Sequence, residues 1–282
     1  MDLSAAVTRI TGIKVIHLSP LSGGCVADVF KADLEDGSSV VAKAGDKANG
    51  LRVEGDMLIY LAHQTRLPVP DIIHNDNGLL IMSHLPSGGQ LTSHAEEHAA
   101  DLIADLHMIT NPYFGFETNT VIGGLPQPNP KTERWVDFYC EHRLLYMGAE
   151  ATKIDRLPLN LMVRLEKFTD TLNKKLLEPN APSLIHGDLW GGNILCHDDK
   201  ITGLIDPAIY FAHAEVELAF TTLFSTFGKT FFRRYQEHRP LDPGFFEERC
   251  DIYVLYPLLV HVRLFGGSYV SQVERILSRF GY

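Results

Sequence analysis

The residues best suited to form one active site are those of a short run and one acidic residue that follows it. The run 186–193 reads HGDLWGGN, and Asp206 lies 18 residues after Asp188 in the sequence IDP. Asp188 could orient an attacking hydroxyl group and accept its proton. The amide oxygen of Asn193 and the carboxylate of Asp206 could hold Mg²⁺ against the phosphates of ATP. The spacing therefore predicts phosphoryl transfer; the plainer interpretation is a glycine-rich turn with two ordinary surface acids.

Strand ends are expected to position these side chains. Asp188 and Asn193 should lie on a loop between two strands, because apolar residues flank the run on both sides. The segment 194–205 reads as a hairpin with a polar turn, so Asp206 would follow its second strand. Oxygen ligands on such rigid ends can converge on one hard cation.

The first 80 or so residues look β-rich and supply a glycine pair. Strands are expected at 29–34 and 39–44, joined by a turn at Asp36 and Gly37. Gly23 and Gly24 precede the first strand and could let the backbone approach phosphates closely. A plain turn explains this pair equally well, because a full G-x-G-x-x-G is missing.

Lys43 and Glu54 are expected to form an ion pair that orients the phosphates. Lys43 lies in the second strand, in the sequence VVAK, and a helix is expected at 50–63 with Asn49 as its N-cap. Glu54 falls inside the apolar arc of that helix. A buried acid needs a partner, which Lys43 could supply. Alternatively, Lys43 is a solvated edge residue and the carboxylate of Glu54 reaches solvent.

A boundary between two lobes is expected near residue 86. Beyond residue 90 the apolar residues follow a helical period, so a small β-rich lobe at 1–86 should precede a larger, mainly helical lobe at 87–282 with one short hairpin. At this boundary the backbone groups of Ser83 and Leu85, with His84 between them, could bind the edge of an adenine ring.

Composition limits the class of protein. The chain has 282 residues, of which 45% are apolar and 21% charged, as in a globular protein with a sizeable core. The formal net charge of -10 argues against nucleic acid or an anionic membrane as the main partner. No apolar stretch approaches the ~20 residues of a membrane span, and the N-terminus lacks the features of a secretory signal.

Cysteine and histidine spacing argues against a disulfide framework or a zinc site. The four cysteines lie far apart, which is typical of free thiols in the cytoplasm. Cys25, next to the glycine pair, is either an activated thiol or a small apolar filler. His94 and His98 have the spacing of zinc ligands on a helix, but acids are also common in a first helical turn.

The run 186–193 resembles the catalytic loop of aminoglycoside phosphotransferase-like kinases. Trp190 makes it similar to the fructosamine kinase (ketosamine 3-kinase) family in particular. The resemblance covers nearly the whole chain. Further segments similar to that family are Phe114–Gly115–Phe116, Ile122–Gly123, Trp135 with Phe138, Arg143–Leu144, and the segments 205–208, 215–219 and 264–269.

The resemblance implies a two-lobed, protein kinase-like fold of class α+β, with ATP and Mg²⁺ as cofactors. It implies phosphorylation of a sugar hydroxyl, O3, of small-molecule or protein-bound ketosamines, and hence protein deglycation. Trp190 would then contact the sugar or its amine carrier, or else be buried in the core. The sequence departs from the family at Ser83, where an acid is common.

Two other functions stay open on the sequence alone. A related kinase could phosphorylate another alcohol, such as an aminoglycoside or choline. The chain could also be a catalytically silent nucleotide-binding or protein-binding module. In each case we expect a monomer or weak dimer without nucleic-acid or membrane partners.

Overall fold

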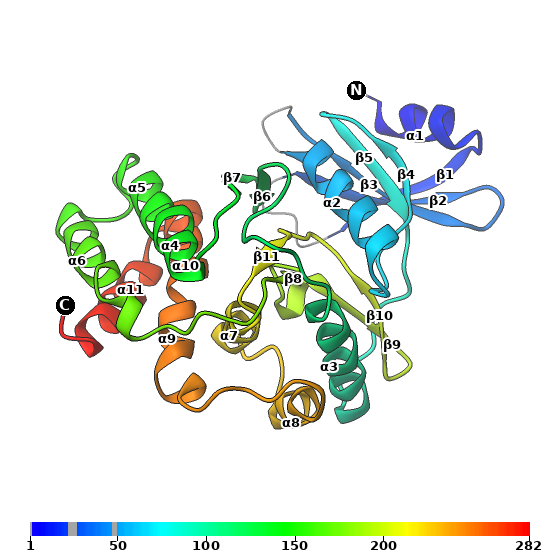
Figure 1. The fold of residues 1–282 in the computed structure, drawn as a ribbon. Coiled ribbons are helices and arrows are strands. Elements are labelled where there is room, and N and C mark those ends of the chain that lie inside the picture. The colour runs from blue at the N-terminus through cyan, green and yellow to red at the C-terminus, as the bar shows by residue number, and fades with distance from the viewer. Residues whose placement is uncertain (1, 22–26, 47–49) are drawn as a thin grey trace.

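The computed structural model describes residues 2–21, 27–46 and 50–282, which form two lobes (Figure 1). The first lobe contains an antiparallel sheet with the strand order β1-β2-β3-β5-β4. Its strands are β1 (Val15–Pro20), β2 (Asp28–Leu34), β3 (Ser39–Ala44), β4 (Ile72–Asn75) and β5 (Leu79–Ser83). The expected hairpin of β2 and β3 is present, and its turn contains Gly37 at a φ of 88°.

Two helices cover opposite faces of this sheet. Successive strand residues point to opposite sides, so apolar residues are available to pack against a helix on each face. Helix α1 (Leu3–Thr11) packs through Ala6 and Val7 on one face. Helix α2 (Leu51–Gln64) packs through Leu51 and Leu58 on the other. The bounds predicted for α2 agree with the structure within one residue at each end, whereas α1 and β1 were not expected. Asn49, the expected N-cap of α2, lies outside the described residues.

The second lobe is mainly helical. Its core contains buried aromatic residues such as Trp135, Phe138 and Tyr139, and α2 contributes Met57 and Leu61 to the same cluster. This double contact fixes α2 between the sheet and the second lobe. The α-helices are α3 (Ser93–His107), α4 (Trp135–Tyr139), α5 (Tyr146–Thr152), α6 (Leu159–Thr169), α7 (Glu215–Leu223), α8 (Lys229–His238), α9 (Cys250–Tyr253), α10 (Leu255–Phe265) and α11 (Ser268–Arg279).

Short strand pairs hold the loops of the second lobe. The predicted hairpin is β9 (Ile194–His197) with β10 (Lys200–Leu204). The expectation of one hairpin is wrong, since β6 (Thr120–Ile122) pairs with β7 (Leu125–Gln127) in a second one. The strand expected before the run 186–193 is β8 (Ser183–Ile185), which pairs with β11 (Tyr210–Ala212). These strands have three residues each, which is too short for a visible alternating pattern.

The apolar periods over 161–176 and about 244–265 each predict a helix, and both helices differ from the structure. The apolar period over 161–176 continues past the end of α6 into a 3-10 turn, Leu172–Lys174. The helix expected at 244–265 is divided into a π-helical turn, Phe245–Arg249, and helices α9 and α10. The boundary at residue 86 stays a prediction.

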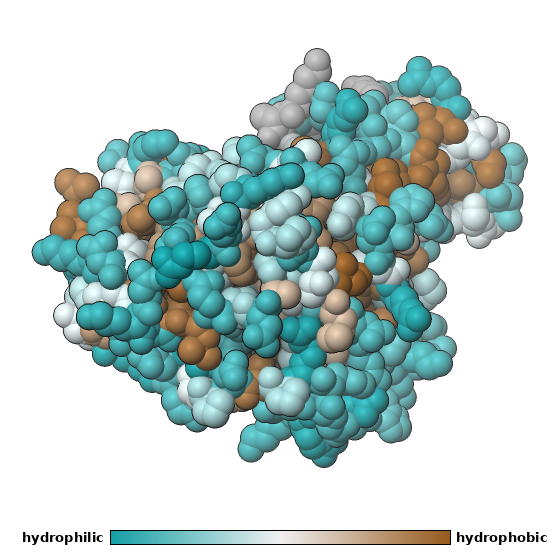
Figure 2. Space-filling model, in the orientation of Figure 1, coloured by the Kyte–Doolittle hydropathy of each residue, from teal (hydrophilic) through white to brown (hydrophobic). Residues whose placement is uncertain are grey.

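The surface in Figure 2 is largely hydrophilic, with apolar residues gathered over part of the first lobe. In the described part of the chain, no helix has both the length and the apolar character needed to cross a membrane.

Candidate active site

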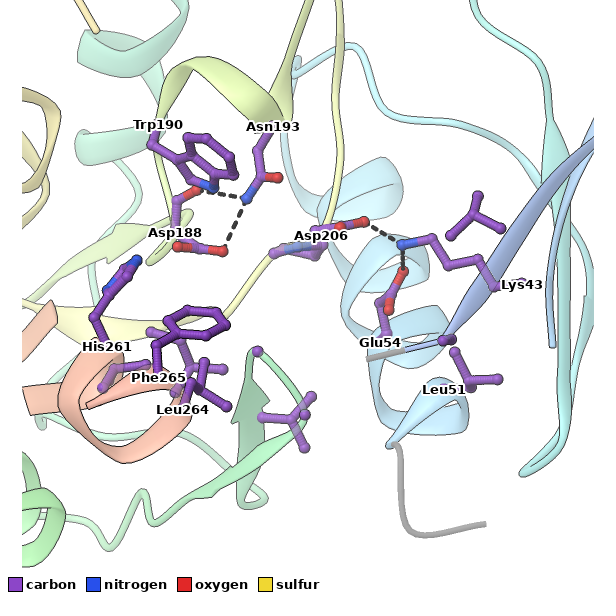
Figure 3. Close-up of a pocket in the computed structure, with 18 of the residues that line it drawn as sticks. Lys43, Leu51, Glu54, Asp188, Trp190, Asn193, Asp206, His261, Leu264 and Phe265 are labelled. Carbon is purple, nitrogen blue, oxygen red and sulfur yellow. Dashed lines mark hydrogen bonds and ion pairs between the residues drawn. The ribbon is translucent and has the colours of Figure 1, made fainter. Parts of the chain in front are cut away.

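A cavity of about 280 Å³ lies where the two lobes meet, close to the usual size of a small-molecule site. Figure 3 shows that labelled side chains from both lobes surround it. The first lobe contributes Lys43 from β3 and Leu51 and Glu54 from α2. The second lobe contributes residues of the run 186–193, which we call the catalytic loop after its resemblance to that of the kinases, together with Asp206 and one end of α10. The cavity is therefore the natural place to test the predicted site residues.

Asp188 and Asn193 are joined by hydrogen bonds within the loop after β8. The side-chain nitrogen Nδ2 of Asn193 donates to Oδ2 of Asp188 and to the Asp188 carbonyl, each at 2.9 Å. Asn193 is buried and ends the 3-10 turn Gly191–Asn193. Because its nitrogen is used in this way, its amide oxygen is the atom left for a metal ion.

The pKa of Asp188 is raised to about 7. Burial is the largest cause, the negative charge of Asp206 adds to it, and the hydrogen bond from Asn193 opposes it. A carboxylate with a pKa near neutral is suited to accept a proton from a hydroxyl group.

Glu217 of α7 holds the backbone of the catalytic loop. Its Oε1 accepts from the Gly187 N–H at 2.7 Å, and its Oε2 accepts from the His186 N–H at 3.2 Å. Nε2 of His107 lies 2.9 Å from the same Oε2. Glu217 is fully buried, and burial by itself would raise its pKa. The hydrogen bond from His107 and the electrostatic interaction with it outweigh burial, so the pKa of Glu217 is lowered. The segment 215–219 resembles the kinase family, but no role was predicted for Glu217.

Lys43 contacts two carboxylates from opposite lobes. Its Nζ lies 2.7 Å from Oε1 of Glu54 and also forms an ion pair with Asp206. Burial disfavours the ammonium ion, but the charges of Glu54 and Asp206 outweigh it and raise the pKa of Lys43. Lys43 is buried and the Glu54 side chain is only 15% exposed, so neither is a solvated surface group. The contact with Asp206 was not predicted.

Trp190 lies at the mouth of the cavity rather than in the core. It is 38% exposed, and its ring centroid lies 5.9 Å from that of Phe224. The indole lies over Gly192, where an added Cβ would approach Trp190 Cη2 to 2.3 Å. The core alternative for Trp190 is therefore wrong, and its ring is available to a ligand.

Several lining residues were missed as site residues. Phe224, at the C-cap of α7, and His261, Leu264 and Phe265 of α10 form a largely apolar wall with Trp190. Burial lowers the pKa of His261, whose Nδ1–H donates to the Pro257 carbonyl at 2.7 Å. The family-like segment 264–269 was the signal that could have identified this wall.

The residues expected to bind adenine do not line this cavity. The Ser83 N–H donates to the Asp71 carbonyl at 2.9 Å, and the His84 N–H donates to the Ser39 carbonyl at 3.3 Å. The Leu85 side chain faces Gly203 of β10. Their role stays a prediction.

Gly23, Gly24 and Cys25 lie outside the described residues.

The oxygen donors of Asp188, Asn193 and Asp206 fit Mg²⁺ better than a transition metal. Within the described ranges, no group of three or more His, Cys, Asp or Glu side chains could hold a metal ion. His98 instead accepts the Ile201 N–H at 3.1 Å, and thus holds strand β10. The zinc alternative therefore has no support in this part of the chain.

Known sequences of one family match this chain over nearly its whole length. The family model for fructosamine kinase matches residues 3–280. A Mus musculus protein named ketosamine-3-kinase is 31% identical over 290 residues, covering 90% of this chain and 92% of that protein. A probable ketoamine kinase of Synechocystis is 39% identical over 168 residues, covering 59% of this chain and 55% of that protein.

Solved structures show the same fold. A structure assigned to a fructosamine-3-kinase of Thermobifida fusca matches with a TM-score of 0.87 and 30% identity, covering 99% of both chains. An aminoglycoside phosphotransferase matches with a TM-score of 0.70 at 16% identity, also covering 99% of both chains, which shows the fold alone. The predicted two-lobed, protein kinase-like α+β fold is thus confirmed. By sequence and by structure, this chain belongs to the fructosamine kinase family.

Proposed function

We propose that this chain is an ATP-dependent kinase that phosphorylates a sugar hydroxyl, O3, of ketosamines and so takes part in protein deglycation. One observation carries the proposal: Asp188 with Asn193, and Lys43 with Glu54 and Asp206, line one cavity between the lobes. Its membership in the fructosamine kinase family supports this activity.

In this proposal each group has a separate task. Asp188 orients the acceptor hydroxyl and takes its proton, which its raised pKa favours. The oxygens of Asn193 and Asp206 would hold Mg²⁺, which when bound neutralises the phosphate charge. Lys43, oriented by Glu54, would contact the phosphates of ATP. Gly23, Gly24, Ser83, His84 and Leu85 remain proposed nucleotide contacts.

The apolar wall favours a ketosamine over a polycationic substrate. Trp190, Phe224 and Phe265 offer ring faces on which a sugar or an amine-bearing chain can stack. Among the described lining residues, the acids are Glu54, Asp188 and Asp206, each of which already has a task in the proposal. An aminoglycoside, with several ammonium groups, would need further acids.

ATP turnover with a substrate panel tests the proposal. The panel contains fructoselysine and ribuloselysine, the same adducts on a protein, an aminoglycoside and choline. We expect turnover with a ketosamine, placement of the phosphate on O3 by NMR, and loss of turnover in Asp188→Asn. Turnover with only the aminoglycoside or choline would reassign the substrate. ATP binding without turnover of any compound would favour a silent module.

The remaining expectations concern the state of the protein. We propose a monomer or weak dimer in a reducing, cytoplasmic compartment, which sedimentation and cell fractionation would test. The described cysteines, Cys140, Cys196 and Cys250, are buried and free, which supports the choice of compartment.

A further inference from the structure

The segment after Asp206 is held at three successive residues by buried side chains from much earlier in the chain. Gln127 Nε2 donates to the Ala208 carbonyl at 3.0 Å. Thr120 Oγ1 donates to the Ile209 carbonyl at 3.3 Å. The Arg143 guanidinium lies over the ring of Tyr210, 3.8 Å from its centroid. We call Thr120, Gln127, Asn129 and Arg143 the polar clamp; Asn129 joins two of its members, because it donates to Thr120 and accepts from Arg143.

Gln127 is the centre of the polar clamp. Its side chain is 0% exposed, yet it makes three hydrogen bonds. Besides the bond to Ala208, Nε2 donates to Thr120 Oγ1 at 2.8 Å, and Oε1 accepts from the Tyr256 hydroxyl at 2.7 Å. A buried amide with all these partners is fixed in one orientation, because any rotation leaves polar atoms unpaired.

The partners of Gln127 belong to both sides of the cavity. The Ala208 N–H donates to the carbonyl of His186 at 2.8 Å, at the start of the catalytic loop. The Ala208 carbonyl lies so close to Gly187 that an added Cβ there would approach it to 2.1 Å. Tyr256 belongs to α10, the helix that carries His261 and the rest of the apolar wall. One side chain thus connects the catalytic loop, the segment with Asp206 and α10.

The hairpin that ends at Gln127 also contacts the helix of Glu54. Its turn contains Gly123 and Gly124, both with positive φ, of 52° and 74°. An added Cβ at Gly50, the N-cap of α2, would approach Val121 Cγ1 to 2.9 Å. At Gly123 an added Cβ would approach Leu264 to 3.0 Å. The same hairpin therefore touches the nucleotide side and the sugar side of the cavity.

We propose that Gln127 is a positioning residue for phosphoryl transfer. It fixes the segment 206–210 against the catalytic loop, and through Tyr256 it ties that segment to the helix of the sugar side. The inference rests on the metal-binding role proposed for Asp206. Gln127 touches neither a substrate nor a metal ion, so it acts through the backbone of Ala208.

The test compares Gln127→Met with Tyr139→Phe. Methionine has a similar length but removes all three hydrogen bonds. Tyr139 is also fully buried, and its one O–H donor is shared between the carbonyls of Ile252 and Tyr253, at 2.9 and 3.0 Å, among residues that do not line the cavity. The control thus loses buried hydrogen bonds without touching the polar clamp. Both purified full-length variants are compared by melting temperature, calorimetric binding of ADP with and without Mg²⁺, and hydrogen exchange of the peptide 204–210.

We expect a specific loss in Gln127→Met. The affinity for ADP in the presence of Mg²⁺ should fall about 10- to 100-fold, the usual effect of removing a group that orients a metal ligand, while metal-free ADP affinity stays unchanged. Exchange within 204–210 should become faster, and kcat for the ketosamine should fall more than KM rises. Tyr139→Phe should lower the melting temperature without these changes. Equal changes in both variants would overturn the proposal.

Two milder variants keep the proposal testable if Gln127→Met does not fold. Thr120→Val removes the hydroxyl group between Gln127 and Ile209, and Tyr256→Phe removes the link to α10. Faster exchange within 204–210 in both supports the polar clamp; unchanged exchange in both overturns it. This readout does not depend on metal binding. If Asp206→Asn leaves Mg²⁺ dependence unaltered, the metal-binding role proposed for Asp206 fails, while exchange still decides the role of Gln127.

Discussion

The carboxylate of Asp206 forms an ion pair with the ammonium group of Lys43, and this contact connects the two lobes across the cavity. Glu54 holds the same ammonium group from α2. If Asp206 is a metal ligand, as proposed, metal binding and the Lys43 contact compete for its carboxylate. Nucleotide binding with Mg²⁺ should therefore rearrange this ion pair.

Asp206→Asn should weaken nucleotide binding only when Mg²⁺ is present. An amide is a weaker ligand for a hard cation than a carboxylate, so we expect a loss of roughly tenfold or more, equivalent to ~1.4 kcal/mol or more. Calorimetry with ADP, with and without Mg²⁺, measures it. The matched control is Asp198→Asn at the β9–β10 turn, since Asp198 also has a positive φ, 47°, and is 90% exposed. An equal loss with and without the metal ion would exclude Asp206 as a ligand.

Asp188→Asn should remove turnover while ATP binding persists. Asparagine keeps the shape and can still accept the hydrogen bond from Asn193, but it cannot take a proton. General base and orientation effects are worth roughly 10²- to 10⁴-fold in rate. Single-turnover phosphorylation, measured beside nucleotide affinity, separates chemistry from binding. Near-normal phosphorylation by this variant would remove Asp188 from its proposed role.

The raised pKa of Asp188 predicts how activity depends on pH. The carboxyl must be ionised to act as a base, so kcat/KM should fall as the pH decreases below about 7. The slope should approach tenfold per pH unit. A profile that stays flat down to pH 5 would contradict this assignment.

The same pKa predicts a gain in stability for Asp188→Asn. The pKa of the folded state, about 7, lies above the reference value of 3.8, so this carboxyl favours folding most below pH 3.8 and loses that contribution as the pH rises through 7. Asparagine does not titrate. The free energy of unfolding of the variant should therefore exceed that of the natural protein by an amount that grows between pH 4 and 7. Above pH 7 the difference should stay constant, at a few kcal/mol (order of magnitude). Urea unfolding at pH 5 and pH 8 measures the difference; an advantage that shrinks as the pH rises would refute the cause given.

Trp190→Ala should affect the ketosamine and leave the fold intact. The indole is 38% exposed, so its loss should cost little stability. The loss of one stacked aromatic contact should lower kcat/KM, which corresponds to a loss of about 1–3 kcal/mol of transition-state stabilisation, while ATP affinity stays the same. Phe246→Ala is a suitable control, because Phe246 is 50% exposed and does not line the cavity. Unchanged ketosamine kinetics in a folded Trp190 variant would exclude its substrate contact.

Local signals predicted β2, β3 and α2 of the first lobe, but not α1 or β1. The Asp36–Gly37 turn and its flanking apolar residues indicated β2 and β3, and the helical period of α2 placed Glu54 toward Lys43. Both residues lie close to these signals in the sequence, so no knowledge of distant packing was required.

Long-range contacts limited the rest of the prediction. Whether Trp190 is buried depends on how Phe224 and α10 pack around it, which no local pattern records. The pairing of β8 with β11 joins distant segments. Gln127 lies in a proline- and glycine-rich stretch that reads as a loop, and its burial becomes visible only once Tyr256 and Ala208 are in place.

The left-handed backbone at Asp206, with a φ of 55°, restricts which residues evolution can accept there. Asparagine and glycine adopt this conformation readily, whereas a β-branched residue is strained in it. A lineage that lost this proposed metal ligand but kept the fold should therefore retain Asn or Gly at this position. Valine or isoleucine at position 206 would indicate that the backbone there has left the left-handed conformation. Such a substitution in a related sequence would therefore mark a change of structure as well as of chemistry.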